Sequence, residues 1–171
     1  MRGWWRWTAG FGIVSVVGAT ALGAQSPPAA GGSSGVDVCS LASGAEFQQA
    51  HGIHPQIGIL PDEPVLTQMK WGPHCDYAGG SIDLFTQSSE LERVLELVKA
   101  IDQRDPIQGL GESAFFTIVY PDDKYRRRGF LAISLGSRVL ALSMDPFGEE
   151  PVAATRPRLE KLAKVVLPRL K

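Results

Sequence analysis

Cysteine and histidine are scarce in this 171-residue chain, which holds two cysteines and three histidines. So few cysteines exclude a small domain built on a dense disulfide framework. Basic charge is not in excess either, because 17 Lys and Arg residues stand against 18 Asp and Glu residues, so we expect no nucleic-acid partner. The 44% apolar content excludes a disordered chain and suits one domain with its own core.

A long hydrophobic run is also missing. The longest apolar stretch, residues 11–22, has about 12 residues, whereas about 20 are needed to span a bilayer. It follows two arginines, Arg2 and Arg6, and ends at the small residues Gly23 and Ala24, an order typical of a secretory signal peptide. We predict a signal peptide over residues 1–24 and an exported chain, periplasmic or extracellular, with no stable membrane anchor after cleavage; the alternative is an uncleaved anchor.

Removal of residues 1–24 takes away two basic residues and no acidic one, which leaves 147 residues with a net charge of −3. The next stretch, residues 25–36, is rich in Gly, Ser, Pro and Ala and predicts a flexible linker. Residues 37–171 then form the single domain that we expect.

The two cysteines of that domain are Cys39 and Cys75. An even cysteine count in an exported chain favours a disulfide. A metal site is the competing interpretation, because imidazoles, a thiolate and a carboxylate together suit zinc or copper; its ligands would come from His51, His54, His74, Cys75 and Asp76. Free thiols are the third alternative. We expect neither a metal nor another cofactor.

Hydrophobic spacing predicts three helices. Ser43 and Glu46 form a capping-box pattern for a helix that ends near His51, with Gly52 just beyond it. A second capping box, at Ser89 and Glu92, opens a helix that continues to Ile101. The third helix starts near Pro157, and Pro168 ends or kinks it near Lys164.

Between the helices the chain predicts about five strands. They span residues 65–71, 75–86, 113–120 and the two arms of a hairpin over 130–144. Gly136 and Ser137 form the two-residue turn, which pairs Leu135 with Arg138, Ile133 with Leu140 and Leu131 with Leu142. We expect the opposite hairpin face to be solvated or to line a shallow groove. The order favours an α+β fold: a single twisted antiparallel sheet with three helices packed mainly on one face.

One basic run stands out at Lys124, Tyr125, Arg126, Arg127 and Arg128. The run predicts a solvated hairpin tip. The alternative is a contact for an anionic partner, with Tyr125 adding a cation–π surface.

Several short motifs resemble a family of small exported bacterial domains of unknown function that includes actinobacterial surface lipoproteins. The motifs are residues 38–46 with the later His51-Gly52, then Cys75-Asp-Tyr77, and Gly109-Leu-Gly-Glu-Ser-Ala-Phe115. This resemblance implies a disulfide between Cys39 and Cys75, a sandwich-like α+β fold and no established catalytic set. The chain departs from the family pattern at Ala42-Ser43 and at Glu112, and neither change creates an active site.

No catalytic motif emerges from the sequence. Gly109-x-Gly111 precedes a predicted strand, not a helix, so it does not fit a dinucleotide cradle, and Gly-x-Ser-x-Gly is absent. We therefore expect an exported, non-catalytic domain that binds a small ligand, an envelope component or a protein. The alternative is a metal-binding protein or hydrolase centred on His51, His54 and His74.

Overall fold

The computed structural model describes residues 35–52, 63–97, 100, 103–120 and 127–170. All of them belong to one compact unit, Ser34–Lys171. The predicted signal peptide and nearly all of the predicted linker therefore lie outside the described residues. Within the described residues, no helix is both long and apolar enough to cross a membrane.

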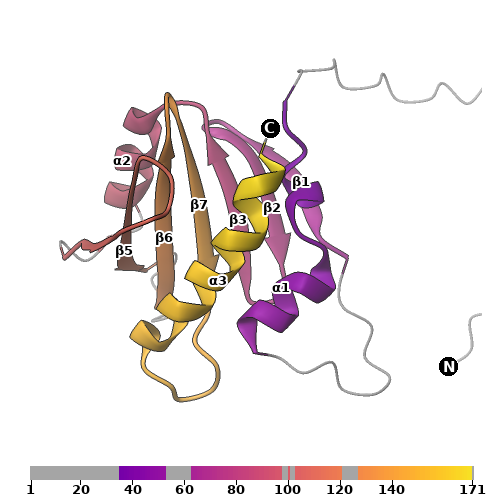
Figure 1. Ribbon diagram of the computed structural model, residues 1–171, viewed down its shortest axis with the longest axis vertical. Coiled ribbons are helices and arrows are strands. Elements are labelled where there is room, and N and C mark those ends of the chain that lie inside the picture. Colours follow the sequence, from indigo (N-terminus) through magenta and orange to yellow (C-terminus); the bar gives the residue numbers. More distant parts are fainter. Residues whose placement is uncertain (1–34, 53–62, 98–99, 101–102, 121–126, 171) are drawn as a thin grey trace, which may run out of the picture. The chain divides into compact units, whose positions relative to one another are not determined.

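The domain is a seven-stranded antiparallel sheet with helices on both faces (Figure 1). Its strands are β1 (Val65–Met69), β2 (Gly72–Tyr77), β3 (Gly80–Phe85), β4 (Asp105–Ile107), β5 (Ser113–Val119), β6 (Arg128–Leu135) and β7 (Arg138–Met144). They lie in the order β1-β2-β3-β7-β6-β5-β4. The α+β class and the antiparallel sheet are confirmed, but the number of strands is seven.

Two features raise the strand count above the prediction. The stretch 75–86 is not one strand, because Ala78 and Gly79 turn the chain and fold β3 back on β2. The second addition is the short strand β4, which contains Pro106. Gly72 and Pro73, expected to break a strand, instead begin β2, and the break lies at Lys70-Trp71.

The helices are α1 (Gly44–His51), α2 (Ser88–Leu97) and α3 (Arg156–Val166). The capping box of α1 is present, with Gly52 in the left-handed conformation at its end. The capping box predicted for α2 is wrong, because Ser89 is the second residue of the helix and its hydroxyl donates to Gln87 Oε1. Pro168 lies in a short 3-10 turn that follows α3, so the α-helix continues to Val166 before it ends.

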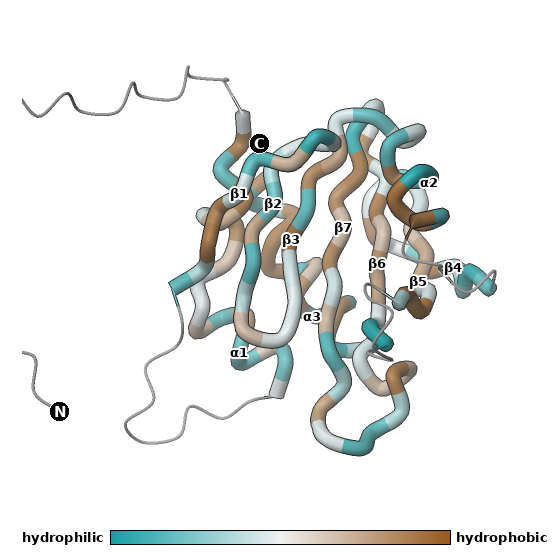
Figure 2. The backbone as a smooth tube through the Cα atoms, turned by 180° about the vertical axis from the view of Figure 1, so that it is seen from behind, coloured by the Kyte–Doolittle hydropathy of each residue, from teal (hydrophilic) through white to brown (hydrophobic). Residues whose placement is uncertain are grey.

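Two of the three helices, α1 and α3, lie on one face of the sheet, and α2 lies on the other. The first face packs against α1, α3 and the 3-10 turn Val38–Leu41, and its core includes Phe47, Leu131, Leu142 and Leu159. The second face, here called the α2 face, carries Phe85, Val139 and Ala141 beneath Leu91 and Leu95 of α2. Figure 2 looks onto the α2 face and shows α2 over one side of it, away from β1 and β2.

The hairpin β6–β7 has the predicted register, with Leu135 opposite Arg138, Ile133 opposite Leu140 and Leu131 opposite Leu142. Gly136 has a φ of 64°, as the two-residue turn requires. The expectation of a solvated or grooved outer face is wrong. Ala132 and Ala141 are almost fully buried there, because α2 packs on these small side chains.

Candidate functional site

Six side chains form a polar network on the α2 face. Strand register gathers five of them, since His74 pairs with Asp83, Asp76 with Ser81, and Ser81 with Ser143. Residues paired directly across an antiparallel ladder point to the same face, which brings these five together. The sixth side chain, Trp71, comes from the turn before β2. Its ring stacks on Phe85, which belongs to the apolar cluster beneath α2.

His74 lies between two carboxylates. Its Nδ1 is 2.6 Å from Asp83 Oδ1, and its Nε2 is 3.0 Å from Asp76 Oδ2. An ionised carboxylate only accepts hydrogen bonds, so both ring nitrogens carry a proton and the ring is an imidazolium. The hydrogen bond to Asp83 is the main cause that raises the pKa of His74 to about 8; burial opposes it, and the charge of Asp76 adds to it.

The remaining donors converge on Asp83. Its Oδ2 accepts from Ser81 Oγ at 2.9 Å, and its Oδ1 also accepts from Trp71 Nε1 at 3.4 Å. Ser81 has a single proton, which it gives to Asp83, so the 2.9 Å contact between Ser81 Oγ and Ser143 Oγ has Ser143 as the donor. The donors Ser81 Oγ, Trp71 Nε1 and His74 Nδ1 thus all point at the buried carboxylate of Asp83, while His74 Nε2 donates to the exposed carboxylate of Asp76.

This geometry does not offer an accessible nucleophile with a base. Ser81 Oγ donates to Asp83, but both residues are buried away from solvent. His74 has no free lone pair with which to accept a proton or bind a metal. Only Asp76 opens to solvent, because its side chain is 56% exposed while those of His74 and Asp83 are 12% and 10% exposed. The network can thus present one carboxylate, oriented by an imidazolium, to a molecule outside.

His51 lies on the other side of the sheet, in α1. Its Nε2 is 2.9 Å from the Asp145 carbonyl oxygen and donates to it, since a carbonyl only accepts. Burial is the main cause that lowers the pKa of His51. The neutral ring leaves a buried Nδ1 with no hydrogen-bond partner.

Of the residues predicted as an alternative metal site, the structure brings together only His74 and Asp76 among those it describes. His51 packs with α1 on the first face, whereas His74 and Asp76 are on the α2 face, and His54 lies outside the described residues. Cys75 is engaged in a disulfide with Cys39, with Cα atoms 5.3 Å apart. Over the part of the chain that the structure describes, no three His, Cys, Asp or Glu residues are grouped to hold a metal ion.

The predicted basic run is described only at its end. Lys124, Tyr125 and Arg126 lie outside the described residues. The Arg127 guanidinium lies 5.5 Å from the centre of the Tyr120 ring. Arg128 begins β6, and its Nε is 2.6 Å from Asp145 Oδ1. This arginine therefore forms an ion pair within the domain.

Four members of the polar network escaped the sequence analysis: Trp71, Ser81, Asp83 and Ser143. A signal for two of them was present, because Ser81 and Asp83 alternate with Ile82 and Leu84 in a strand that is otherwise apolar. Polar residues at alternate positions imply one polar face. The sequence analysis drew no conclusion from this alternation, and the face is buried, because Ser81, Asp83 and Ser143 are as whole residues at most 7% exposed.

Comparison with known proteins adds no relative to this picture. No protein-family model, curated protein or solved structure matches the chain. The resemblance to small exported bacterial domains therefore stays a prediction, and the function has to be argued from the geometry of the site.

Proposed function

We propose that this protein is an exported, non-catalytic binding module whose ligand contacts the polar network at Asp76. The observation that carries the proposal is the clamp of His74 between Asp76 and Asp83. The clamp holds the half-exposed carboxylate of Asp76 in one orientation, and His74 is itself held by the buried carboxylate of Asp83. A carboxylate held in one orientation loses less conformational freedom when it binds than a mobile one does.

Export is supported by the disulfide between Cys39 and Cys75, because such bonds persist in oxidising compartments outside the cytoplasm. The signal peptide expected over residues 1–24 points the same way. Both described histidines are unavailable as general bases, because both nitrogens of His74 face carboxylates and His51 is buried.

The chemistry at the opening favours a ligand that donates hydrogen bonds. Asp76 uses Oδ2 on His74, and its exposed carboxylate can accept further donors. Amines and hydroxyl groups meet this need, and the net charge of −3 that remains after signal cleavage favours the amines at long range. We therefore assign the ligand to cationic or polyhydroxylated envelope components, such as polyamines, cationic peptides or saccharides.

Thermal unfolding of the disulfide-bonded protein tests this assignment. The panel contains spermidine, a Lys-rich peptide, neutral oligosaccharides, zinc chloride and a polyanion. A ligand that binds only the folded state raises the melting temperature. We expect a rise with at least one amine or saccharide, and its loss in Asp76→Asn.

Glu112→Gln is the matched control, because Glu112 is an exposed carboxylate in the loop before β5, remote from the network. It should leave the rise unchanged. No rise with any amine or saccharide, or an equal rise in Asp76→Asn, contradicts the proposal. A rise with zinc alone, lost in His74→Gln, would instead favour the metal-binding alternative.

A further inference from the structure

The two edges of the sheet are built differently. At one edge, β4 has three residues and contains Pro106, which lacks a backbone N–H. A short strand with a proline is a common device that prevents pairing with another chain. At the other edge, β1 has five residues, Val65–Met69, with no proline and no charge. This second edge has none of those protections.

Three residues of β1 are exposed, Val65, Leu66 and Gln68, and the two apolar ones lie on opposite faces of the sheet. Val65 lies on the α2 face with Asp76, and it is 59% exposed. Leu66 lies on the first face with Cys75, and it is 53% exposed. Among the described strands, β1 pairs only with β2. A strand edge that has no partner and carries an exposed apolar residue on each face is a template for strand addition.

We infer that β1 pairs with β1 of a second copy of this chain, antiparallel about a two-fold axis that passes beside Thr67. In this register Thr67 faces its own counterpart, Val65 faces Met69 and Leu66 faces Gln68. A two-fold axis perpendicular to the sheet keeps each residue on its own face, so paired residues must both be odd-numbered or both even-numbered. This register meets that condition and pairs all five residues of the strand.

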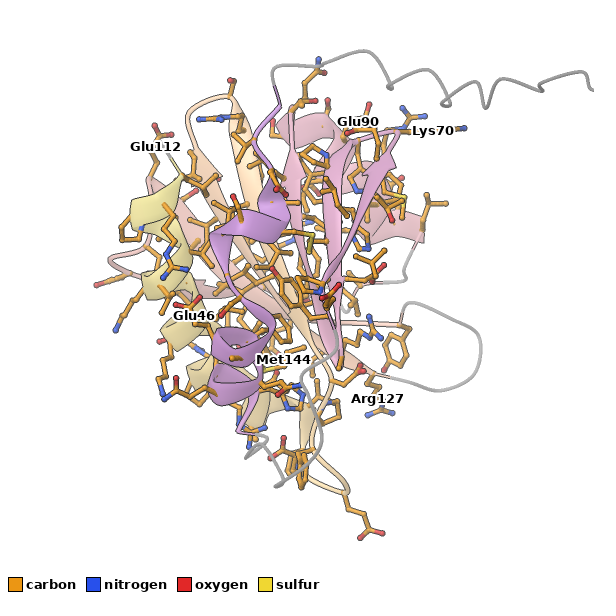
Figure 3. All side chains as sticks on the ribbon, turned by 90° about the vertical axis from the view of Figure 1, so that its right-hand side faces the viewer. Glu46, Lys70, Glu90, Glu112, Arg127 and Met144 are labelled. Atoms are coloured by element: carbon orange, nitrogen blue, oxygen red, sulfur yellow. A yellow bond between two sulfur atoms is a disulfide. The ribbon has the colours of Figure 1, made fainter. Side chains whose placement is uncertain are left out.

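A second copy is favoured over a different protein because β1 is complementary to itself. No like charges oppose each other within Val65–Met69, and each exposed apolar residue meets an uncharged side chain of the other copy. A Thr–Thr pair lies at the centre, where hydroxyl groups can hydrogen-bond across the strands. Lys70 follows β1, and Figure 3, which faces this edge, shows its side chain pointing outward beyond the strand.

The dimer would turn both α2 faces to the same side, since the axis is perpendicular to the sheet. Two copies of Asp76 would then face one direction, which raises the avidity for a ligand with repeated groups. This last consequence rests on the proposed function, whereas the dimer itself does not.

Light scattering coupled to size exclusion tests the dimer on the disulfide-bonded protein. We expect a dimer fraction that grows with concentration in the wild type. Leu66→Glu with Gln68→Glu places like charges opposite each other at both pairs and should give a monomer, as should Leu66→Lys with Gln68→Lys. Both positions are exposed, so the fold is expected to persist in either variant. An equimolar mixture of the two variants should restore the dimer.

Leu97→Glu is the control, because Leu97 of α2 is 77% exposed and lies outside β1. It should dimerise like the wild type, which separates strand pairing from general apolar adhesion. A wild type that stays monomeric at about 200 µM, charged variants that still dimerise, or a mixture that stays monomeric would each overturn the inference. Hydrogen exchange of the wild type gives a measurement that needs no variant: protection of the β1 amides should rise with concentration, and protection independent of concentration overturns the inference.

Discussion

The ring of Tyr77 lies flat on the ring of Phe47, with centroids 4.4 Å apart and planes 5° from parallel. The hydroxyl of Tyr77 also donates to the carbonyl oxygen of Ala42 at 2.9 Å. This pair joins β2 to α1 just beyond the disulfide that joins β2 to the turn before α1. The opening segment of the domain is thus held to the sheet by a covalent bond, a hydrogen bond and a ring stack.

Tyr77→Phe should lower the free energy of unfolding by about 1 to 2 kcal/mol, because the buried Ala42 carbonyl loses its donor while the ring stack remains. Phe47→Ala should cost about 3 to 5 kcal/mol, since it empties a fully buried site. Urea unfolding followed by circular dichroism measures both. Equal losses of unfolding free energy in the two variants would contradict our assignment of a small contribution to the hydrogen bond and a larger one to the packing of Phe47.

Gly80→Ala should be strongly destabilising. A Cβ at this position would lie 2.1 Å from the Ser143 carbonyl oxygen and 2.7 Å from Phe47 Cζ, so β3 could not keep its distance from β7. Gly148→Ala is the control, with no atom within 4 Å of its Cβ, and it should cost only about 1 kcal/mol for its positive φ. The difference in urea midpoint checks the prediction, and similar midpoints would refute it.

Removal of the disulfide should lower stability by about 3 to 4 kcal/mol on the chain-entropy model, because the bond closes a loop between residues 36 apart. Cys39→Ala with Cys75→Ala allows the comparison without a reductant. The urea midpoint of the double variant should fall below that of the wild type. An unchanged midpoint would show that packing alone holds the 3-10 turn before α1 against β2.

Because of His74, the free energy of unfolding should decrease as the pH rises from neutral to alkaline values. Its pKa is about 8 in the folded state and 6.5 in the unfolded chain, so the folded protein binds the extra proton. The stabilisation is complete below pH 6.5 and is lost as the pH rises through 8; its upper bound is about 2 kcal/mol. Urea unfolding at pH 6 and pH 9 should show this loss in the wild type and not in His74→Gln. A wild type equally stable at both values would contradict the imidazolium clamp.

His51 should act in the opposite direction. Its pKa is lowered by burial, so the unfolded chain binds more protons as the pH falls below 6.5, and stability falls with it. The window from pH 6 to 5 suits the measurement, because the stabilisation by His74 changes little there and the comparison with His51→Gln cancels the contributions of other groups. His51→Gln should flatten the dependence of the urea midpoint on pH in that window, even if the variant is less stable throughout. A slope as steep as that of the wild type would rule out His51 as the cause.

Local residue chemistry was sufficient for several elements of the fold. Ser43, Glu46 and Gly52 define the start and end of α1, and Gly136 sets the register of β6 with β7. These signals work within a few residues, where capping and turn geometry act directly. The α+β class followed from the same local signals.

The candidate site was only partly predictable. His74 and Asp76 were named as a possible metal site, but their partner Asp83 was not, because it depends on the turn at Ala78-Gly79 that folds β3 onto β2. The alternation of apolar residues does not show where a strand reverses, so one strand was expected where two exist. The sequence also did not show that His51 lies on the other face of the sheet from His74, because that depends on which face α1 covers.

The sequence by itself determined the start and end of α1, the presence of two cysteines able to pair and the register of the hairpin β6–β7, since the capping and turn signals act between neighbours in the chain. Tertiary structure alone decided that α2 covers the second face, that His74 is held between two carboxylates and that β1 is the edge strand of the described sheet. The physical reason is that hydrophobic patterning says which side chains avoid water but not which other element covers them. The pairing of strands decides which elements cover each other. The pairing of β2 with β3 also places Asp83 beside His74, which keeps the His74 ring protonated.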